Sequence, residues 1–499
     1  MATADIPPHD FNRHQWRSSS EDPKTYQREP SGTEVLMDME NRLNHGEFTL
    51  FLGLELDFRM DISLTEFEHL AREAWIALRF QVPTIAARTP VPATNRAIIT
   101  YRIPDSLAEL EDWANRTLRP ARDCDSVDTL RHEVGNRYIS DPNGDQVFLY
   151  VVSKDGRPTG FLFQASHVII DGKGTKILMD IYLRNILVPV LAEEVKLDLS
   201  SFKWGLEVEN LLPCVSEILV PHEPREGPEY DKTMQEVLGG YASEFPKMYP
   251  LKPRAEPGPG PTRHVQRLFT PQESDQIRAA VRAHGFTVSQ IFLAALNLVV
   301  ATDNPPTSET PADAAFVYYG IVNNRSDRLI APYSGRDGYP GYCLGVSVLS
   351  FPVDMLRNKT DFFDKALLLD MAEQVKQAYK KQQQYPALLA IQSQICDIML
   401  SPFFAGAPPA PPPGGPFFAG DGITEHHFEH EYKDSGGREV VSVKSIFTSV
   451  NMTDPAFFRV SSWRDRLQAD LDVNERVVPV EVANEWMENW MKLVKLILL

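Results

Sequence analysis

The stretch FLFQASHVIIDGKG, residues 161–174, runs from a strand-like segment through a histidine into a glycine turn. Phe161, Phe163 and His167 occupy alternate positions, so in a β-strand their side chains lie on one face. The two phenylalanines predict that this face is buried. A histidine at the buried end of a strand is either a hydrogen-bonded core residue or a group held for proton transfer near neutral pH.

The residues after this histidine favour the second role. Asp171 and Gly172 complete the pattern H-x-x-x-D-G, and a helix is predicted over 175–187. A buried strand, a glycine turn and a helix together form a corner that exposes one side chain. A structural role for His167 remains an alternative. For Asp171 the structural role is favoured, because a carboxylate one turn past the histidine is well placed to pair with an arginine and brace the corner.

Length, charge and cysteine content restrict the class of protein. A chain of 499 residues exceeds one ordinary hydrophobic core, so two or more lobes are expected. Fifty basic and 68 acidic residues leave a net charge of -18, which disfavours nucleic acid and anionic membrane surfaces as partners. The four cysteines form no C-x-x-C pair, which disfavours a disulfide framework and a zinc site. Because the N-terminus is polar and the apolar runs are short, we expect a soluble, cytoplasmic protein. We also expect it to be a monomer.

Strand-like and helix-like periodicities alternate in both halves of the chain. The predicted strands are 50–58, 146–153, 160–167, 314–325 and 344–354, and the predicted helices are 64–78, 175–187, 271–284, 288–300, 364–384 and 480–499. Proline and glycine concentrate over 221–262, which we interpret as a crossover between an N-terminal lobe, 1–220, and a C-terminal lobe, 263–499. Residues 403–422 are rich in proline, which disfavours a helix or a central strand, so a flexible loop is expected there.

Several segments together resemble one superfamily of enzymes. They are HVIIDG (167–172), LFLGLELDF (50–58) and FQVPTIAAR (80–88) in the first half, and the helical pair 269–300, YYGIVNNR (318–325) and YPGYCLGVSVLSF (339–351) in the second. These segments are similar to those of the H-x-x-x-D acyltransferases, which include chloramphenicol acetyltransferase, the plant BAHD acyltransferases, peptide-synthetase condensation domains and fungal trichothecene O-acetyltransferases. The N-terminal stretch 14–34 and the lack of the plant D-F-G-W-G motif make the resemblance greatest to the trichothecene 15-O-acetyltransferase branch.

The resemblance implies a fold and a set of roles. The fold is α/β, with two chloramphenicol-acetyltransferase-like lobes, each a mixed sheet with flanking helices, and an active-site channel between them. His167 would be the general base, while Asp171, Gly172 and Arg325 would be structural, with Arg325 as the salt-bridge partner of Asp171. The implied activity is that of an acyl-CoA-dependent O-acyltransferase. Acetyl-CoA would be its co-substrate, a hydroxylated terpenoid or polyketide its acceptor, and no cofactor would be permanently bound.

Acyl transfer suggests two further residues for the active site, and other functions of the protein remain open. Negative charge develops on the thioester oxygen, and Thr448 and Ser449 are candidate oxyanion or substrate contacts. The histidine-rich stretch 424–431 lacks an H-E-x-x-H arrangement, so no metal site is expected. The alternatives are a condensation-like enzyme that cyclises its substrate or takes a carrier-bound acyl group, and a non-catalytic binding module. Ser166 stands where condensation domains have a second histidine, which favours a free CoA thioester as donor.

Overall fold

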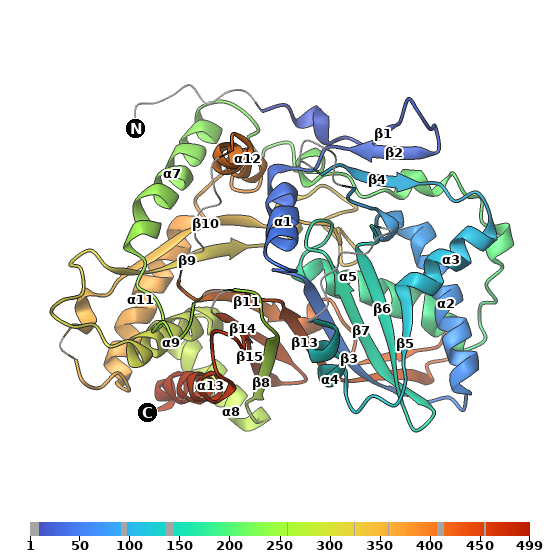
Figure 1. The fold of residues 1–499 in the computed structure, drawn as a ribbon. Helices are drawn as coiled ribbons and strands as arrows, with labels where there is room; N and C mark the ends of the chain where they lie inside the picture. Colours follow the sequence, from blue (N-terminus) through green and yellow to red (C-terminus); the bar gives the residue numbers. More distant parts are fainter. Residues whose placement is uncertain are drawn as a thin grey trace.

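The structure is a computed structural model that shows two regions of sheet and helix. It describes residues 9–90, 97–135, 144–256, 258–323, 325–357, 359–406, 414–453 and 456–499. In Figure 1 a six-stranded sheet lies on the right of the view, and a four-stranded sheet lies at the lower left. The prediction of an α/β fold with two lobes is confirmed.

The six-stranded sheet has the strand order β12-β13-β3-β7-β6-β5. Its strands are β3 (Leu50–Phe58), β5 (Leu118–Ala121), β6 (Val147–Lys154), β7 (Arg157–Ala165), β12 (Glu431–Lys433) and β13 (Glu439–Val450). Neighbouring strands are antiparallel except for β5 and β6. Because β12 and β13 come from the segment that we expected in the C-terminal lobe, the chain returns to the first sheet late in the sequence. The lobes are therefore not continuous in sequence.

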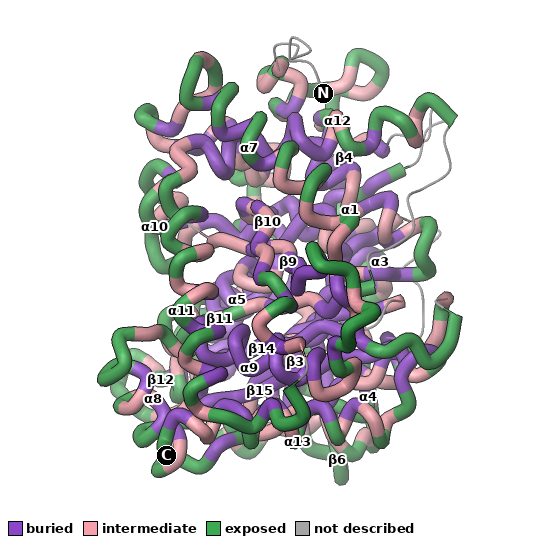
Figure 2. The backbone as a smooth tube through the Cα atoms, turned by 90° about the vertical axis from the view of Figure 1, so that its left-hand side faces the viewer, coloured by how far each residue is buried: buried purple, intermediate pink, exposed green. Residues whose placement is uncertain are grey.

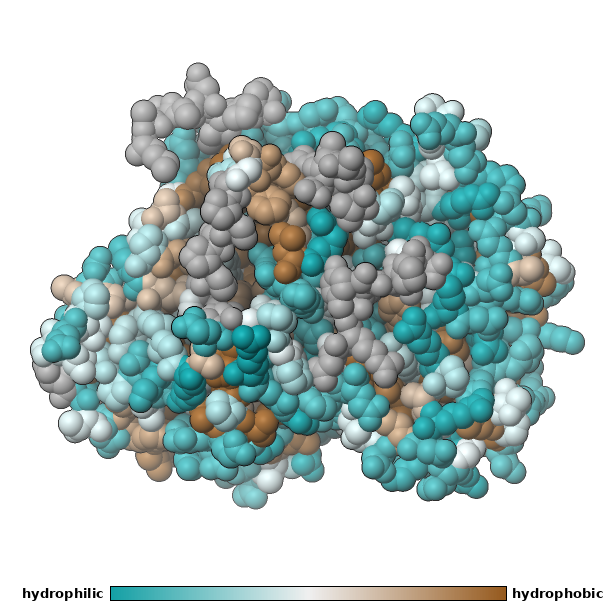
Figure 3. Space-filling view, in the orientation of Figure 1, coloured by the Kyte–Doolittle hydropathy of each residue, from teal (hydrophilic) through white to brown (hydrophobic). Residues whose placement is uncertain are grey.

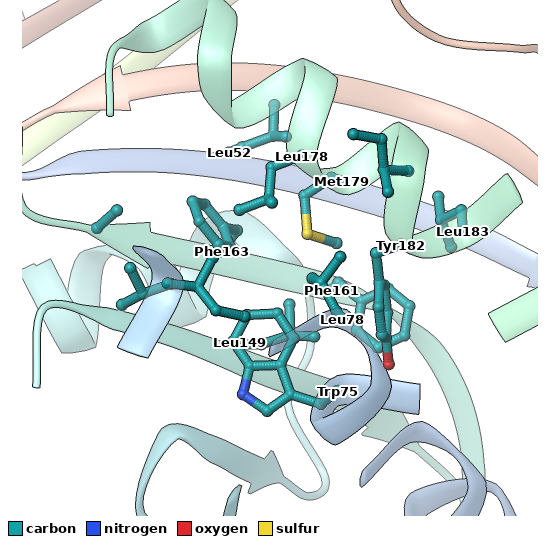
Figure 4. Close-up of a cluster of buried hydrophobic side chains, with 14 of the residues drawn as sticks. Leu52, Trp75, Leu78, Leu149, Phe161, Phe163, Leu178, Met179, Tyr182 and Leu183 are labelled. Carbon is teal, nitrogen blue, oxygen red and sulfur yellow. The ribbon is translucent and has the colours of Figure 1, made fainter. Parts of the chain in front are cut away.

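Helices cover both faces of this sheet. They are α2 (Leu64–Gln81), α3 (Leu107–Thr117), α5 (Gly172–Ile181) and α6 (Val188–Leu191) on one side, with a π-helical segment, Tyr182–Leu187, between α5 and α6, and α4 (Val127–Gly135) on the other. Figure 4 shows Phe161 and Phe163 of β7 among Leu178 of α5 and Trp75 of α2, and all four side chains are fully buried. The face of β7 that leads to His167 is thus the face that holds α5, as the alternation predicts.

The four-stranded sheet has the order β11-β14-β15-β8. Its strands are β8 (Thr262–Leu268), β11 (Phe417–Ile423), β14 (Ala456–Trp463) and β15 (Arg466–Asn474), packed with helices α8 (Pro271–Ala283), α9 (Val288–Asp303), α11 (Lys365–Gln382) and α13 (Val480–Lys495). The prediction of a flexible loop over 403–422 is wrong at both ends. Helix α12 (Gln392–Phe404) includes its first residues, and strand β11 includes its last ones. Strand β11 contains no proline and lies at the sheet edge, whereas residues 407–413 lie outside the described residues.

The remaining elements lie around and between these sheets. They are the three-stranded sheet β1 (Arg17–Ser18), β2 (Thr25–Arg28) and β4 (Ile99–Arg102), the two-stranded sheet β9 (Ala315–Val322) and β10 (Gly345–Pro352), and helices α1 (Gly32–Leu43), α7 (Pro228–Glu244) and α10 (Arg325–Arg328). Helix α7 lies within the predicted crossover and contacts β10, so this crossover is more than a linker. Helix α1 packs against α12 from the other half of the chain.

Helix starts follow the capping residues of the sequence. Ser63 caps α2, and capping boxes formed by Thr270 with Glu273 and by Thr287 with Gln290 start α8 and α9. The predicted helices 64–78, 271–284 and 288–300 therefore begin at the first residues of α2, α8 and α9.

Burial and hydropathy follow this layering. In Figure 2 the strands near the centre of the molecule are mostly buried, and the outer turns are mostly exposed. Figure 3 shows a largely hydrophilic face, with apolar side chains gathered over α1 and α12 near the top of the view. These two helices share a small apolar cluster made of Val35, Leu36, Met39, Leu400, Phe403 and Phe404.

In the described part of the chain no single helix has the length and apolar composition to cross a membrane. Only α8 and α9 meet both requirements as a pair, and this pair is bent by 96°.

A buried histidine links α4 of the first lobe to the four-stranded sheet. His264 on β8 lies between Asp128 of α4 and Asp470 of β15, with Nδ1 2.8 Å from Asp128 and Nε2 3.1 Å from Asp470. Both ring nitrogens can donate to carboxylates only if the imidazole is protonated. Burial by itself lowers the pKa of His264, but the two hydrogen bonds raise it to about 9. The His264 ring therefore carries a positive charge at neutral pH.

We expect the charge on His264 to make stability fall at alkaline pH. Its pKa of about 9 in the folded state lies above the ordinary value of 6.5, so its contribution is complete below 6.5 and is lost as the pH rises through 9. A shift of this size corresponds to about 3 kcal/mol of unfolding free energy. The variant His264→Gln keeps hydrogen-bonding groups but cannot take up a proton. It should be less stable than the wild type at about pH 6, and the difference should shrink by about pH 10.

Urea unfolding of both proteins at the two pH values measures this difference. If the free-energy difference between the wild type and His264→Gln is the same at both pH values, His264 does not carry the charge that we assign to it.

Candidate active site

His167 stands at the corner between β7 and α5. The strand ends at Ala165, and the turn that follows is anchored by three buried side chains, Val168, Ile169 and Ile170. From residue 161 to residue 171, His167 is the one residue that is not fully buried. The corner predicted from the sequence is therefore present, and the side chain that it leaves accessible is the imidazole.

The two nitrogens of His167 have different surroundings. Nδ1 is buried and has no hydrogen-bond partner of regular geometry among the described residues. Burial lowers the pKa of His167 below its ordinary value, while the charge of Asp171 and the backbone carbonyls of His167 and Ile170 raise it in return. The net effect is a neutral imidazole at neutral pH. Because Nδ1 is enclosed, Nε2 is the nitrogen that can accept a proton from a bound molecule.

Asp171 is fully buried and is held by donors other than His167. Both of its carboxylate oxygens lie 2.8 Å from Nη2 of Arg325, which follows β9 of the other half of the chain. The backbone N–H groups of Gly174 and Cys343 donate to the same carboxylate, each at 2.8 Å. The contact between Asp171 and Arg325 that we predicted from the sequence is therefore present.

The segment that follows Arg325 wraps around its guanidinium group. Nε donates to the carbonyl of Tyr339 at 2.8 Å, and Nη2 donates to the carbonyl of Gly341 at 2.7 Å. The backbone of this segment also lies directly against α5, because a Cβ atom on Gly174 would be 1.9 Å from the carbonyl oxygen of Pro340. Gly174 is thus the glycine that close packing requires. The sequence singled out Gly172 instead, where an added Cβ would meet no described atom within 4 Å.

Tyr342 lies against His167. The centres of the phenol and imidazole rings are 5.3 Å apart, with the ring planes inclined by 56°. The Tyr342 side chain is buried, and its neighbours in sequence are Gly341 and Cys343, which bind Arg325 and Asp171. The arrangement brings an aromatic ring from the second half of the chain against the imidazole of the first.

Thr448 and Ser449 lie on opposite faces of β13. The Thr448 hydroxyl donates to Asp421 at 3.1 Å, and the Ser449 hydroxyl donates to Asp472 at 2.6 Å. Ser449 also accepts a hydrogen bond from Arg131, at 2.6 Å. Both hydroxyl protons are thus donated to carboxylates in this structure. The role of Thr448 and Ser449 as oxyanion or substrate contacts stays a prediction.

The histidine-rich stretch 424–431 makes local contacts. His430 Nε2 lies 3.0 Å from Glu425, and burial lowers the pKa of His427 to about 3. Within the described ranges, no group of three or more His, Cys, Asp or Glu side chains is arranged to hold a metal ion.

A family model described as 15-O-acetyltransferase Tri3 matches residues 6–340 of the chain. The protein belongs to this 15-O-acetyltransferase family. The trichothecene 15-O-acetyltransferase TRI3 of Fusarium sporotrichioides is 24% identical over 488 residues, which are 93% of this chain and 92% of that protein. The trichothecene O-acetyltransferase TRI3 of Trichoderma arundinaceum is 22% identical over 509 residues, 95% of each protein. Membership of the family confirms the prediction of an acyltransferase.

Solved structures support the same fold. The TRI3 structure from Fusarium sporotrichioides covers 100% of both chains with a TM-score of 0.86 at 22% sequence identity. The first condensation domain of the calcium-dependent antibiotic synthetase has a TM-score of 0.60 at 12% identity, and the match covers 94% of this chain and 95% of that one. The 15-O-acetyltransferase family thus shares its two-lobed architecture with condensation domains.

Sequence reasoning missed Tyr342, Lys176 and Asp421. Lys176 is buried on α5 and its Nζ lies 3.3 Å from Asp421, the residue at which the pairing of β11 with β14 shifts by one position. Such a bulge re-aims one side chain of a strand. A lysine on the helix after H-x-x-x-D-G was visible in the sequence, but its partner 245 positions away had no local signal.

We expect Asp171 and Arg325 to be strongly coupled in stability. Removing one partner leaves the other charge buried and unpaired, so Asp171→Ala and Arg325→Ala should each lower the unfolding free energy by about 3–5 kcal/mol. The double variant should lose clearly less than the sum of the two single losses. Chemical denaturation of the four proteins measures the coupling energy.

The exposed pair Lys154 and Asp125, 2.9 Å apart, provides the matched control. Its coupling energy should be below about 1 kcal/mol, because solvent screens an exposed ion pair. Additive losses for Asp171 and Arg325 would contradict the assignment of the pair as the buried brace of the site.

Proposed function

We propose that this protein transfers an acetyl group from acetyl-CoA to a hydroxyl group of a trichothecene or a related hydroxylated terpenoid. The observation that carries the proposal is the corner at His167, which leaves one neutral imidazole accessible among ten buried neighbours between residues 161 and 171. The relatives from Fusarium sporotrichioides and Trichoderma arundinaceum support the acceptor class, since both are trichothecene O-acetyltransferases.

The chemistry follows from a neutral base beside two reactants. Nε2 of His167 accepts the proton of the acceptor hydroxyl as the hydroxyl oxygen attacks the carbonyl carbon of the thioester. The tetrahedral intermediate collapses with cleavage of the C–S bond. The imidazolium then returns its proton to the departing CoA thiolate, and the acetyl ester is released. Because both reactants meet at one base, no acyl-enzyme intermediate is required.

Asp171 and Arg325 take part by keeping this base neutral and in place. The carboxylate receives hydrogen bonds from Arg325, Gly174 and Cys343, so its charge is compensated away from the imidazole. A carboxylate free to turn towards His167 would favour the protonated imidazole, which cannot act as a base.

We also propose that the protein works as a monomer in the cytoplasm. One chain supplies His167, Asp171, Arg325 and Tyr342, so no second copy is needed to complete the site. The cysteines at 124, 214, 343 and 396 are free, which suits a reducing compartment. Light scattering on a size-exclusion column and imaging of a fluorescent fusion test these two points.

We expect His167→Ala to lower kcat by about 10²- to 10⁴-fold, the usual contribution of a positioned general base. The melting temperature should stay near that of the wild type, because the imidazole is only partly buried and Nδ1 makes no regular hydrogen bond within the described chain. The measurement is incubation with acetyl-CoA and a panel of hydroxylated trichothecenes and other terpenoids, read by mass spectrometry for a gain of one acetyl group.

His69→Ala provides a matched control, since His69 lies on α2 with 65% of its side chain exposed. This variant should keep full activity. A loss of activity in His167→Ala that only parallels a loss of folded protein would show that His167 is a structural histidine.

A further inference from the structure

Acyl transfer needs a hydrogen-bond donor for the thioester oxygen, which becomes negatively charged in the transition state. The two hydroxyls that the sequence suggested for this task are committed to carboxylates, Thr448 to Asp421 and Ser449 to Asp472. The donor must therefore come from another residue close to His167. Tyr342 is the side chain that packs on the imidazole.

Tyr342 supplies a hydroxyl that no described residue uses. Its side chain is only 7% exposed, yet its oxygen forms no hydrogen bond with the described part of the chain. The oxygen is not among the buried side-chain atoms that lack a partner, so the hydroxyl reaches the accessible surface. The centre of its ring is 5.3 Å from the centre of the His167 ring, so the phenol that carries this unpaired hydroxyl lies directly beside the imidazole.

The hydroxyl of Tyr342 stays protonated at every pH at which the enzyme would work. Burial, together with the neighbouring charge of Asp171, raises the pKa of Tyr342 well above its ordinary value. A phenol with a raised pKa donates a hydrogen bond and does not compete with His167 for the substrate proton. The two residues are therefore suited to opposite tasks, one as acceptor and the other as donor.

The backbone on both sides of Tyr342 is fixed by the ion pair of the site. The carbonyl of Gly341 accepts from Arg325 at 2.7 Å, and the N–H of Cys343 donates to Asp171 at 2.8 Å. The backbone that carries the phenol is thus bound to the same Asp171–Arg325 ion pair that holds the turn after His167. Donors that are fixed before the reaction stabilise a developing charge more strongly than donors that must reorganise.

We propose that the hydroxyl of Tyr342 donates a hydrogen bond to the thioester oxygen of the acyl donor as negative charge develops there, which makes Tyr342 a second catalytic residue beside His167. This inference rests on the proposed function, because it assigns the donor for the same acyl transfer. The proton of Tyr342 stays on the phenol throughout. The bonds that form and break are those already described for attack on the thioester.

The test compares Tyr342→Phe with the wild type in the full chain. Phenylalanine keeps the ring against His167 and removes only the hydroxyl. We expect kcat to fall by about 10²- to 10³-fold, the usual cost of losing one oxyanion donor, with KM for acetyl-CoA changed by less than about threefold. Tyr333→Phe, a half-buried tyrosine of the same segment, is the matched control and should keep the kcat of the wild type.

Two reactions are followed, so that the inference can fail separately from the proposed function. One is acetyl transfer to the trichothecene panel, and the other is slow hydrolysis of acetyl-CoA by water, measured as release of the CoA thiol. Hydrolysis passes through the same oxyanion and needs no correct acceptor. Tyr342→Phe should slow both reactions, and a wild type that hydrolyses acetyl-CoA but acetylates no panel member would contradict only the proposed acceptor.

Three results would overturn the assignment of Tyr342. They are a kcat within about threefold of the wild type in both reactions, a change confined to KM, and a loss of activity that merely follows a loss of folded protein in thermal unfolding. If His167→Ala is inactive while Tyr342→Phe stays active, the assignment of His167 as the general base is kept, and the oxyanion donor is a group other than Tyr342.

Discussion

The buried contact between Asp171 and Arg325 is the constraint on which the site depends. Asp171 lies four residues after His167, close enough to hold the imidazole in its charged form. Arg325 and the N–H groups of Gly174 and Cys343 instead take up the carboxylate. The acid is thereby separated from the base although the two share one turn of the chain. Burial lowers the pKa of His167 below its ordinary value against the opposing charge of Asp171, so the imidazole at this corner is neutral.

The same ion pair connects the two halves of the molecule. Asp171 caps α5, whereas Arg325 follows β9 and is enclosed by the segment 339–343. This segment carries Tyr342 to His167. An arginine that neutralises one carboxylate therefore also positions an aromatic hydroxyl from the other half of the chain. The ion pair, the segment 339–343 and the proposed oxyanion donor form one unit at the end of β7, where we propose that acyl transfer takes place.

Buried charges elsewhere at the junction of the lobes also occur in pairs. Lys176 of α5 meets Asp421 of β11 at 3.3 Å, and Arg459 of β14 donates to Asp472 of β15. A buried charge without a partner costs several kcal/mol, so each must be matched by one from a neighbouring element. These pairs also take up nearby hydroxyl protons, including that of Thr448. Lys176, Asp421, Arg459, Asp472 and Thr448 are thus engaged in ion pairs and hydrogen bonds between neighbouring elements.

Local features of this protein follow from its amino-acid sequence. Alternation over Phe161–His167 predicts the strand and its buried face, and capping residues such as Thr270 predict helix starts, because both depend on neighbours within one turn or one strand. The folded structure is needed to see that β13 joins the first sheet, that a bulge lies at Asp421, the partner of Lys176, and that Tyr342 lies against His167. These contacts join residues more than a hundred positions apart, and their geometry is set by strand register and lobe packing, for which no local pattern exists.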